Sequence, residues 1–332
     1  MMPLNASLDG QWPSTWFGRN EEFAQAYDYL SGWSGGPRSL GVHGVRGVGK
    51  SAFLGELAKS LSERDFAVIA VRASATYSVA ERIAEWLERR EPSGSRFWTG
   101  SVEATVAERA ISEFQPEKPL VFIVDELDAV SRGDTNDLFD NLLNAAENHG
   151  RYFQFIGAGS GLRWRASLTG PVSWTIDAFR IVTLSRLNQA DSMALLRDSI
   201  KADGALTTPE DQQLERLVGP ARGVPRLLHA AGQQFVLSSR SGLSVEAAMS
   251  SAVEQLRHQK VVRSAISFGA NEETQAAFRF LEGEIPPGEG ADLDSLIRKS
   301  WQSGPANFTE GLDQLLLMGF YELRGDWVWA SE

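Results

Sequence analysis

Cysteine is absent from the 332-residue chain, and only four histidines occur in it. Disulfide bonds and thiolate metal sites are therefore excluded, and the composition fits a reducing compartment. No run of eighteen apolar residues is present, so no transmembrane helix is expected. The N-terminal stretch has no basic region followed by an apolar one, which argues against a secretory signal. We therefore expect a cytoplasmic protein with no membrane segment.

Positive charge is also scarce, because 32 lysines and arginines face 43 aspartates and glutamates, for a net charge of −11. A protein that binds phosphate backbones over its whole surface is usually basic, so this balance counts against broad nucleic-acid binding. A local basic patch remains compatible with it. Hydrophobic residues make up 42% of the chain and charged residues 23%, as in ordinary globular proteins, and the length suggests two or three domains.

Apolar strands alternate with amphipathic helices in the first part of the chain. Because parallel strands need crossover helices between them, this alternation predicts an α/β domain with a parallel sheet covered on both faces. The predicted strands are residues 38–44, 66–71, 120–124, 152–156 and 179–184. The predicted helices are residues 20–30, 50–61, 79–89, 105–114 and 138–147.

After residue 184 the strand pattern stops. Helices are predicted at residues 189–201, 209–218, 224–237 and 245–267, then at 276–281, 293–301 and 308–318. A hairpin of residues 321–323 and 328–329 follows the last helix, and three helices with a hairpin are typical of a winged helix. The predicted divisions are an arm (1–14), the α/β domain (15–186), a helical lid (187–268) and the winged helix (269–332).

The sequence Gly44-Val-Arg-Gly-Val-Gly-Lys-Ser51 fits the phosphate-loop pattern G-x-x-x-x-G-K-[S/T] between a strand and a helix. Its glycines let backbone N–H groups face phosphate oxygens, and the next helix adds its positive N-terminus. Lys50 is then expected to meet the β- and γ-phosphates of ATP, with the Ser51 hydroxyl on Mg²⁺. The competing interpretation is a glycine-rich turn with a surface lysine. The predicted contacts with ATP are Gly44, Val45, Arg46, Gly47, Val48, Gly49, Lys50, Ser51 and Ala52.

Two adjacent carboxylates, Asp125 and Glu126, follow the wholly apolar segment 120–124, about 75 residues after the phosphate loop. Ligands of open α/β sheets bind at the carboxyl ends of the strands, which is where these acids are placed. Asp125 is predicted to hold Mg²⁺ through water. Glu126 is predicted to orient and deprotonate the attacking water. Asp128 has two competing interpretations, a helix cap and a catalytic group.

These motifs resemble those of the AAA+ and STAND branches of P-loop ATPases over about residues 16–234. Trp16-Phe-Gly-Arg-Asn-Glu-Glu22 is similar to the "F-V-G-R-x-x-E" box that opens initiator-type and STAND ATPase domains and packs near the adenine. Asp125-Glu-Leu-Asp128 is similar to the "D-E-x-D" of origin-recognition-type initiators. The resemblance implies an AAA+-like P-loop NTPase domain with a helical lid and a C-terminal winged helix. It also implies that Phe17 and Arg19 lie at the nucleotide.

The resemblance suggests further catalytic residues. Gly223-Val-Pro-Arg226 is similar to the sensor 2 region, whose arginine touches the γ-phosphate, although a salt bridge is an alternative role for Arg226. Ser160 fills the sensor 1 position after a strand, where the family usually has Asn, Thr or Ser. Arg163 and Arg165 lie in the interval that carries an arginine finger, which reaches into a neighbouring subunit. An equally weighted interpretation is that these two residues are ordinary arginines of an exposed loop.

The third predicted domain is strongly acidic. Residues 271–332 contain twelve acidic and four basic residues, a net charge of −8, and its third helix carries Glu310 and Asp313 but no lysine or arginine. Because phosphate contact needs cations, we expect this domain to contact a protein and not DNA. Its three tryptophans, Trp301, Trp327 and Trp329, have two interpretations, interface aromatics and core residues, and at these spacings we expect core packing.

The sequence thus predicts an ATP-hydrolysing molecular switch that forms homo-oligomers when ATP binds. One alternative is a DNA-binding initiator or transposition-type regulator. Another is a nucleotide-binding scaffold with negligible turnover, which the intact pair of Asp125 and Glu126 argues against.

Overall fold

The computed structural model describes most of the chain. The described residues are 18–32, 38–74, 76–90, 101–129, 132–162, 179–204, 209–268, 272–286, 288–318, 320–324 and 326–330. They fall into two compact units. The first unit comprises residues 20–43 and 50–183, and the second comprises residues 18–19, 44–49 and 184–332.

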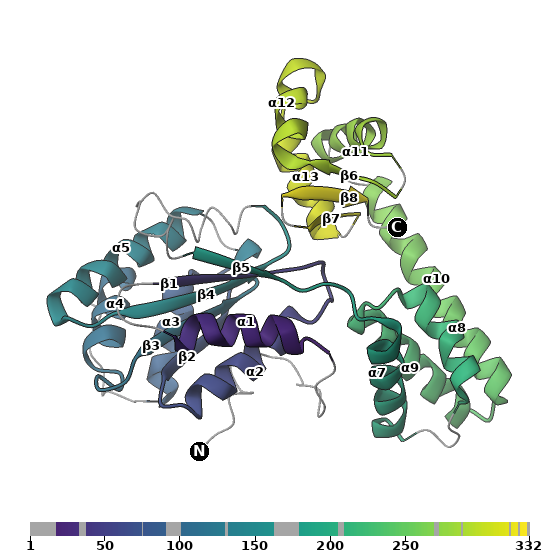
Figure 1. Ribbon diagram of the computed structural model, residues 1–332, viewed down its shortest axis with the longest axis horizontal. Helices are drawn as coiled ribbons and strands as arrows, with labels where there is room; N and C mark the ends of the chain where they lie inside the picture. The colour runs from purple at the N-terminus through teal and green to yellow at the C-terminus, as the bar shows by residue number, and fades with distance from the viewer. Residues whose placement is uncertain are drawn as a thin grey trace. The chain divides into compact units, whose positions relative to one another are not determined.

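The first unit is built on a five-stranded sheet with the strand order β2-β3-β4-β1-β5 (Figure 1). All four neighbouring pairs are parallel, which confirms the predicted α/β fold. The strands are β1 (Arg38–His43), β2 (Ala67–Arg72), β3 (Leu120–Asp125), β4 (Phe153–Gly159) and β5 (Phe179–Thr183). β4 extends three residues beyond the predicted end at Ile156, because Gly157, Ala158 and Gly159 pair with the end of β1.

Helices cover the sheet because its central strands are apolar on both faces. The helices of this unit are α1 (Asn20–Ser31), α2 (Lys50–Ser62), α3 (Val79–Arg90), α4 (Val102–Ser112) and α5 (Arg132–His149), with a short 3₁₀ helix η2 (Leu127–Ala129). Alternate residues of β2, β3 and β4, such as Ile69, Phe122 and Phe155, form one core cluster with α3, α4 and α5. Figure 1 shows α1 and α2 together on the same side of the sheet.

The helical part of the second unit contains α7 (Gln189–Ala202), α8 (Asp211–Ala221), α9 (Pro225–Arg240) and α10 (Val245–Phe268), all close to their predicted positions. Their apolar faces share one core cluster. Gly223 closes this bundle against the chain before α7. Its φ is +68°, and a Cβ there would lie 2.1 Å from the carbonyl oxygen of Leu187, so a side chain cannot be accommodated.

The last segment of the chain combines three helices with a three-stranded sheet of order β6-β8-β7, whose pairs are antiparallel. Its elements are α11 (Glu272–Glu284), β6 (Gly290–Asp292), α12 (Leu293–Ser303), α13 (Phe308–Met318), β7 (Tyr321–Arg324) and β8 (Trp327–Ala330). The predicted hairpin is therefore present. Strand β6 was missed because it has only three residues and no apolar alternation.

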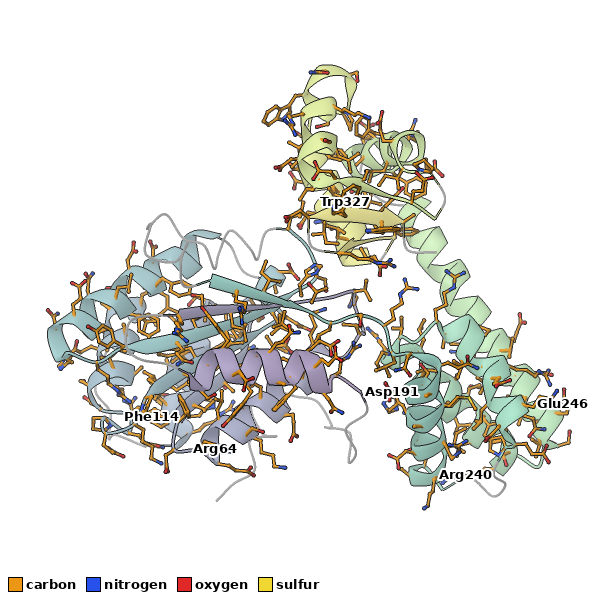
Figure 2. The ribbon with its side chains drawn as sticks, in the orientation of Figure 1. Arg64, Phe114, Asp191, Arg240, Glu246 and Trp327 are labelled. Atoms are coloured by element: carbon orange, nitrogen blue, oxygen red, sulfur yellow. The ribbon has the colours of Figure 1, made fainter. Side chains whose placement is uncertain are left out.

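The expectation of core packing for the three tryptophans is wrong for two of them. Trp301 is 80% exposed, and Trp327, labelled in Figure 2, is 49% exposed. On α12 the buried residues are Leu296 and Ser300, four positions apart, so the next position points about 100° away from the core. Trp329 is the exception, because its ring covers Gly290, where a Cβ would lie 2.5 Å from the indole.

Among the helices of the described residues, none is both long and apolar enough to cross a membrane.

Arg151 secures the side of the sheet opposite the carboxyl ends of the strands. Its side chain, just before β4, donates to main-chain carbonyl oxygens at the end of α4 and in the loop that leads to β3. The acceptors are Ala110, Ile111, Phe114, Gln115 and Lys118, at 2.6 to 3.3 Å. One guanidinium thereby satisfies carbonyl groups that the end of a helix leaves without an internal partner.

Replacing Arg151 by methionine is expected to lower the free energy of unfolding by about 2–4 kcal/mol, because part-buried carbonyls then lose their donors. Urea denaturation followed by circular dichroism measures this change. The matched control is Arg89→Met, on the exposed end of α3, where Arg89 pairs with Glu85. That change is expected to cost less than about 1 kcal/mol. Equal losses in the two variants would contradict the role assigned to Arg151.

Candidate functional site

The predicted phosphate loop connects β1 to α2. It consists of residues 44–49, and α2 begins at Lys50. Gly47 and Gly49 have φ angles of +86° and +103°, a region that side chains disfavour. A Cβ on Gly47 would lie 2.9 Å from the Cβ of Arg226, so this glycine also allows a close approach. The loop therefore has the backbone freedom that a phosphate cradle requires.

Two arginines that the family resemblance singled out lie against this loop. The backbone N–H of Arg226, in the first turn of α9, donates to the carbonyl oxygen of Gly47 at 3.2 Å. The Arg19 guanidinium donates to the carbonyl oxygen of Val48 and to the Ser185 hydroxyl, both at 3.3 Å. Both arginines are thus placed beside the loop, and their contacts with a nucleotide remain predictions.

The first turn of α2 faces the ends of β3 and β4. The Ser51 hydroxyl donates to Asp125 Oδ2 at 2.5 Å, and the Lys50 ammonium donates to Ser160 Oγ at 2.6 Å. Asp125 is 1% exposed, whereas the Glu126 side chain is 57% exposed. The structure therefore brings Lys50, Ser51, Asp125 and Ser160 together, and their contacts with a nucleotide remain predictions.

The pairing of Ser51 with Asp125 provides two oxygen donors at one point, and Mg²⁺ prefers oxygen donors. No group of three or more His, Cys, Asp or Glu side chains arranged to hold a metal occurs within the described ranges. Two protein oxygens suit Mg²⁺, which in phosphate sites completes its shell with water and phosphate oxygens. The residues present therefore fit ATP together with Mg²⁺.

Glu126 has an unusual backbone conformation. Its φ is +55°, in the left-handed region that residues other than glycine rarely adopt. Its backbone N–H donates to Asp125 Oδ1 at 2.9 Å, and its carbonyl oxygen accepts from Ala129 at 2.9 Å. The turn directs the glutamate away from the strand, so that Asp125 stays buried while Glu126 faces solvent, where a water molecule can reach it.

Arg72 is a site residue that the sequence analysis missed. It ends β2, directly beside Asp125 in the parallel register. Its guanidinium lies 3.7 Å from Asp125 Oδ2 and 3.7 Å from Glu126 Oε2, so it offsets the repulsion between the two neighbouring carboxylates. A cation at the end of an apolar strand was a visible signal, but its meaning depends on β2 and β3 being neighbours.

Asp128 bonds to the segment after β4. It lies in η2, and its carboxylate accepts from the backbone N–H groups of Ser160 and Gly161 at 2.5 and 3.2 Å. These bonds give Asp128 a role that neither the helix-cap nor the catalytic interpretation described, and both of those interpretations stay predictions. Phe17, Arg163 and Arg165 lie outside the described residues, so their predicted roles stay predictions.

Comparison with known proteins agrees with this geometry. Residues 15–156 match the AAA ATPase domain family. This match, over less than half of the chain, agrees with the resemblance of its motifs to the AAA+ branch of P-loop ATPases. No curated protein matches the chain in sequence.

Two solved structures share the fold over almost the whole chain. The Aeropyrum pernix ORC2 protein, solved as ADPNP–ADP complexes, has 13% sequence identity and a TM-score of 0.60. The alignment covers 97% of this chain and 92% of that one. Cdc6p from Pyrobaculum aerophilum has 14% identity and a TM-score of 0.54 over the same shares of the two chains. At these identities the likeness concerns the fold.

Lys50→Ala is expected to remove most of the affinity for ATP while the protein stays folded, because it deletes the positive charge that faces the β- and γ-phosphate oxygens. Calorimetric titration with an ATP analogue measures the affinity, and circular dichroism measures folding. Lys59→Ala is the matched control, since Lys59 lies exposed in the last turn of the same helix. Wild-type affinity in a folded Lys50→Ala protein would refute the assignment.

Proposed function

We propose that this protein is an ATP-binding and ATP-hydrolysing molecular switch. The observation that carries this proposal is the convergence of Lys50, Ser51 and Asp125 at the end of the phosphate loop, with Glu126 turned toward solvent beside them. An arrangement for binding alone would not need a carboxylate placed where it can reach water. For this reason we favour hydrolysis over a scaffold with negligible turnover.

The residues have separate tasks in this proposal. Lys50 would bind phosphate oxygens of ATP in place of the Ser160 hydroxyl, and Ser51 together with Asp125 would hold Mg²⁺. Mg²⁺, when bound, neutralises charge on the phosphates. Glu126 then orients a water molecule and accepts its proton, which requires Arg72 to leave Glu126 accessible. Arg226 and Arg19, whose bonds to the phosphate loop support this role, are proposed to add positive charge that favours the phosphates.

We also propose that the protein forms homo-oligomers when ATP binds. The ORC2 protein of Aeropyrum pernix, which shares the fold, was solved with ADPNP and ADP, in keeping with nucleotide binding by this architecture. In our proposal the segment between β4 and β5 contributes Arg163 or Arg165 to the nucleotide of a neighbouring subunit. Such an arginine stabilises the charge of the transferring phosphoryl group.

The C-terminal segment is proposed to be a winged helix that contacts a protein. On α13 the residues Phe308, Leu312 and Leu315 are buried together with Asp313, so the exposed side offers Glu310 and no lysine or arginine. The exposed side chains of Trp301 and Trp327 are of the kind that is enriched at protein interfaces. The acidic charge disfavours the alternative of a DNA-binding initiator.

Glu126→Gln is expected to bind ATP with near wild-type affinity and to hydrolyse it at least about a hundredfold more slowly, because the amide cannot accept a proton from water. Single-turnover measurements with labelled ATP separate this step from product release. Glu88→Gln, an exposed change on α3, provides the control for the substitution itself. Equal rates for Glu126→Gln and wild type would assign the general base to another residue.

The mass of the protein in solution is expected to rise when a non-hydrolysable ATP analogue is added and to stay unchanged by duplex DNA at near-physiological salt. The reason is that nucleotide links subunits, whereas the net charge of −11 repels a polyanion. Light scattering coupled to size exclusion measures both, with Lys50→Ala as a control that does not respond to nucleotide. Binding to DNA tighter than about micromolar would favour the initiator alternative instead.

A further inference from the structure

The main chain of Ser160 is held on both sides by buried or half-buried side chains. On its N–H side, the Asp128 carboxylate accepts from Ser160 and from Gly161, one oxygen for each N–H group. On its carbonyl side, His43 Nε2 lies 3.2 Å from the Ser160 oxygen and, in the tautomer with a proton on Nε2, donates to it. His43 is 1% exposed and Ser160 is 8% exposed, so water competes little for these bonds.

These two holding residues come from different elements at the carboxyl end of the sheet. His43 is the last residue of β1 and precedes the phosphate loop, whereas Asp128 lies in η2, just after the two candidate catalytic acids. Lys50 donates to the side-chain hydroxyl of Ser160, whereas Asp128 and His43 bond to its main chain. The position of the serine main chain therefore does not depend on Lys50, and it is retained when Lys50 turns to another partner.

The segment of Asp128 also carries the acids of the site. Asp125 accepts from Ser51, Leu127 is buried, and Ala129 closes a turn onto the Glu126 carbonyl. Five consecutive residues thus link the proposed Mg²⁺ ligands and the general base to Ser160 through one short, hydrogen-bonded turn. A carboxylate that accepts two N–H groups makes charge-assisted bonds, which are roughly twice as strong as neutral ones.

We propose that Asp128 is a positioning residue for ATP hydrolysis, which acts with His43 by holding the Ser160 main chain so that the serine hydroxyl stays aimed at the γ-phosphate position. This inference rests on the proposed ATPase function. Once the main chain is fixed, one torsion with three staggered rotamers sets the place of the hydroxyl. A donor that is already in place stabilises developing charge without having to reorganise during the reaction.

The alternative is that Asp128 only stabilises the fold. The two roles differ in what a substitution changes. A structural role lowers stability and leaves the rate of the folded protein intact. A positioning role lowers kcat through Ser160, so that the effect of Asp128 disappears once the serine hydroxyl has been removed.

The test uses Asp128→Asn, Ser160→Ala and the double variant in the full-length protein, with ATP as substrate. Asparagine has the same shape as aspartate but offers only one acceptor oxygen. Each single change is expected to lower kcat about 10- to 100-fold and to leave KM within about twofold of wild type. This loss of kcat is somewhat smaller than that caused by removing one strong hydrogen-bond donor to the transition state. The kcat of the double variant is expected to be no lower than that of Ser160→Ala, because the two residues act as one unit.

A kcat for Asp128→Asn equal to that of wild type would overturn the proposal, and so would losses that multiply in the double variant. Asp65→Asn is the matched control, because Asp65 lies exposed at a surface turn with a left-handed φ that asparagine tolerates. Substitutions of His43 test the hydrogen bond on the carbonyl side of Ser160. His43→Gln, which keeps an N–H donor, is expected to retain more kcat than His43→Leu, and these variants also serve if Asp128→Asn does not fold.

Hydrogen exchange separates this proposal from the ATPase function itself. The amides of Ser160 and Gly161 are expected to exchange slowly in wild type and at least about tenfold faster in Asp128→Asn, since each loses or weakens its acceptor. Fast exchange in wild type would refute the positioning role. A wild-type protein without Glu126-dependent turnover would instead refute the ATPase function, even with both amides protected.

Discussion

Parallel pairing brings the carboxyl ends of β1, β2, β3 and β4 to one edge of the sheet, and the cluster of Asp125, Arg72 and Ser160 depends on this alignment. The register sets His43 beside Gly159 and Arg72 beside Asp125. From that edge the chain turns into the phosphate loop, into η2 and into the segment of Ser160. The bonds from Ser51 to Asp125 and from Lys50 to Ser160 then close the edge into a single cluster.

Much of this arrangement could be predicted from local patterns. The apolar runs and the glycine-rich loop indicated the strands, α2 and the neighbourhood of Lys50, Ser51, Asp125 and Glu126, because each signal lies within a few consecutive residues. The roles of Arg72, His43 and Asp128 could not be predicted in the same way. Each depends on which strands are neighbours, and strand order is a long-range property that periodicity does not contain.

The exposed tryptophans show a different limit of sequence reasoning. A large aromatic residue is usually buried, and only the phase of α12 relative to Leu296 and Ser300 reveals that Trp301 is not. That phase depends on where the helix begins. Here the Asp292 side chain caps the helix by accepting from the backbone N–H of Ser295, and β6 ends at the same residue. The strand that the sequence did not indicate therefore also fixes which side of α12 meets solvent.

Arg151 has a consequence for chemistry at the opposite edge of the sheet. By binding carbonyl oxygens before β3 while standing just before β4, it ties together the points where these two strands begin. A shift of one residue between paired strands would send every side chain to the other face. Asp125 would then exchange its buried place with a neighbour, although nothing near the nucleotide had changed. The alignment of Asp125 and Glu126 with the first turn of α2 is thus partly set at the opposite end of β3, outside the candidate site.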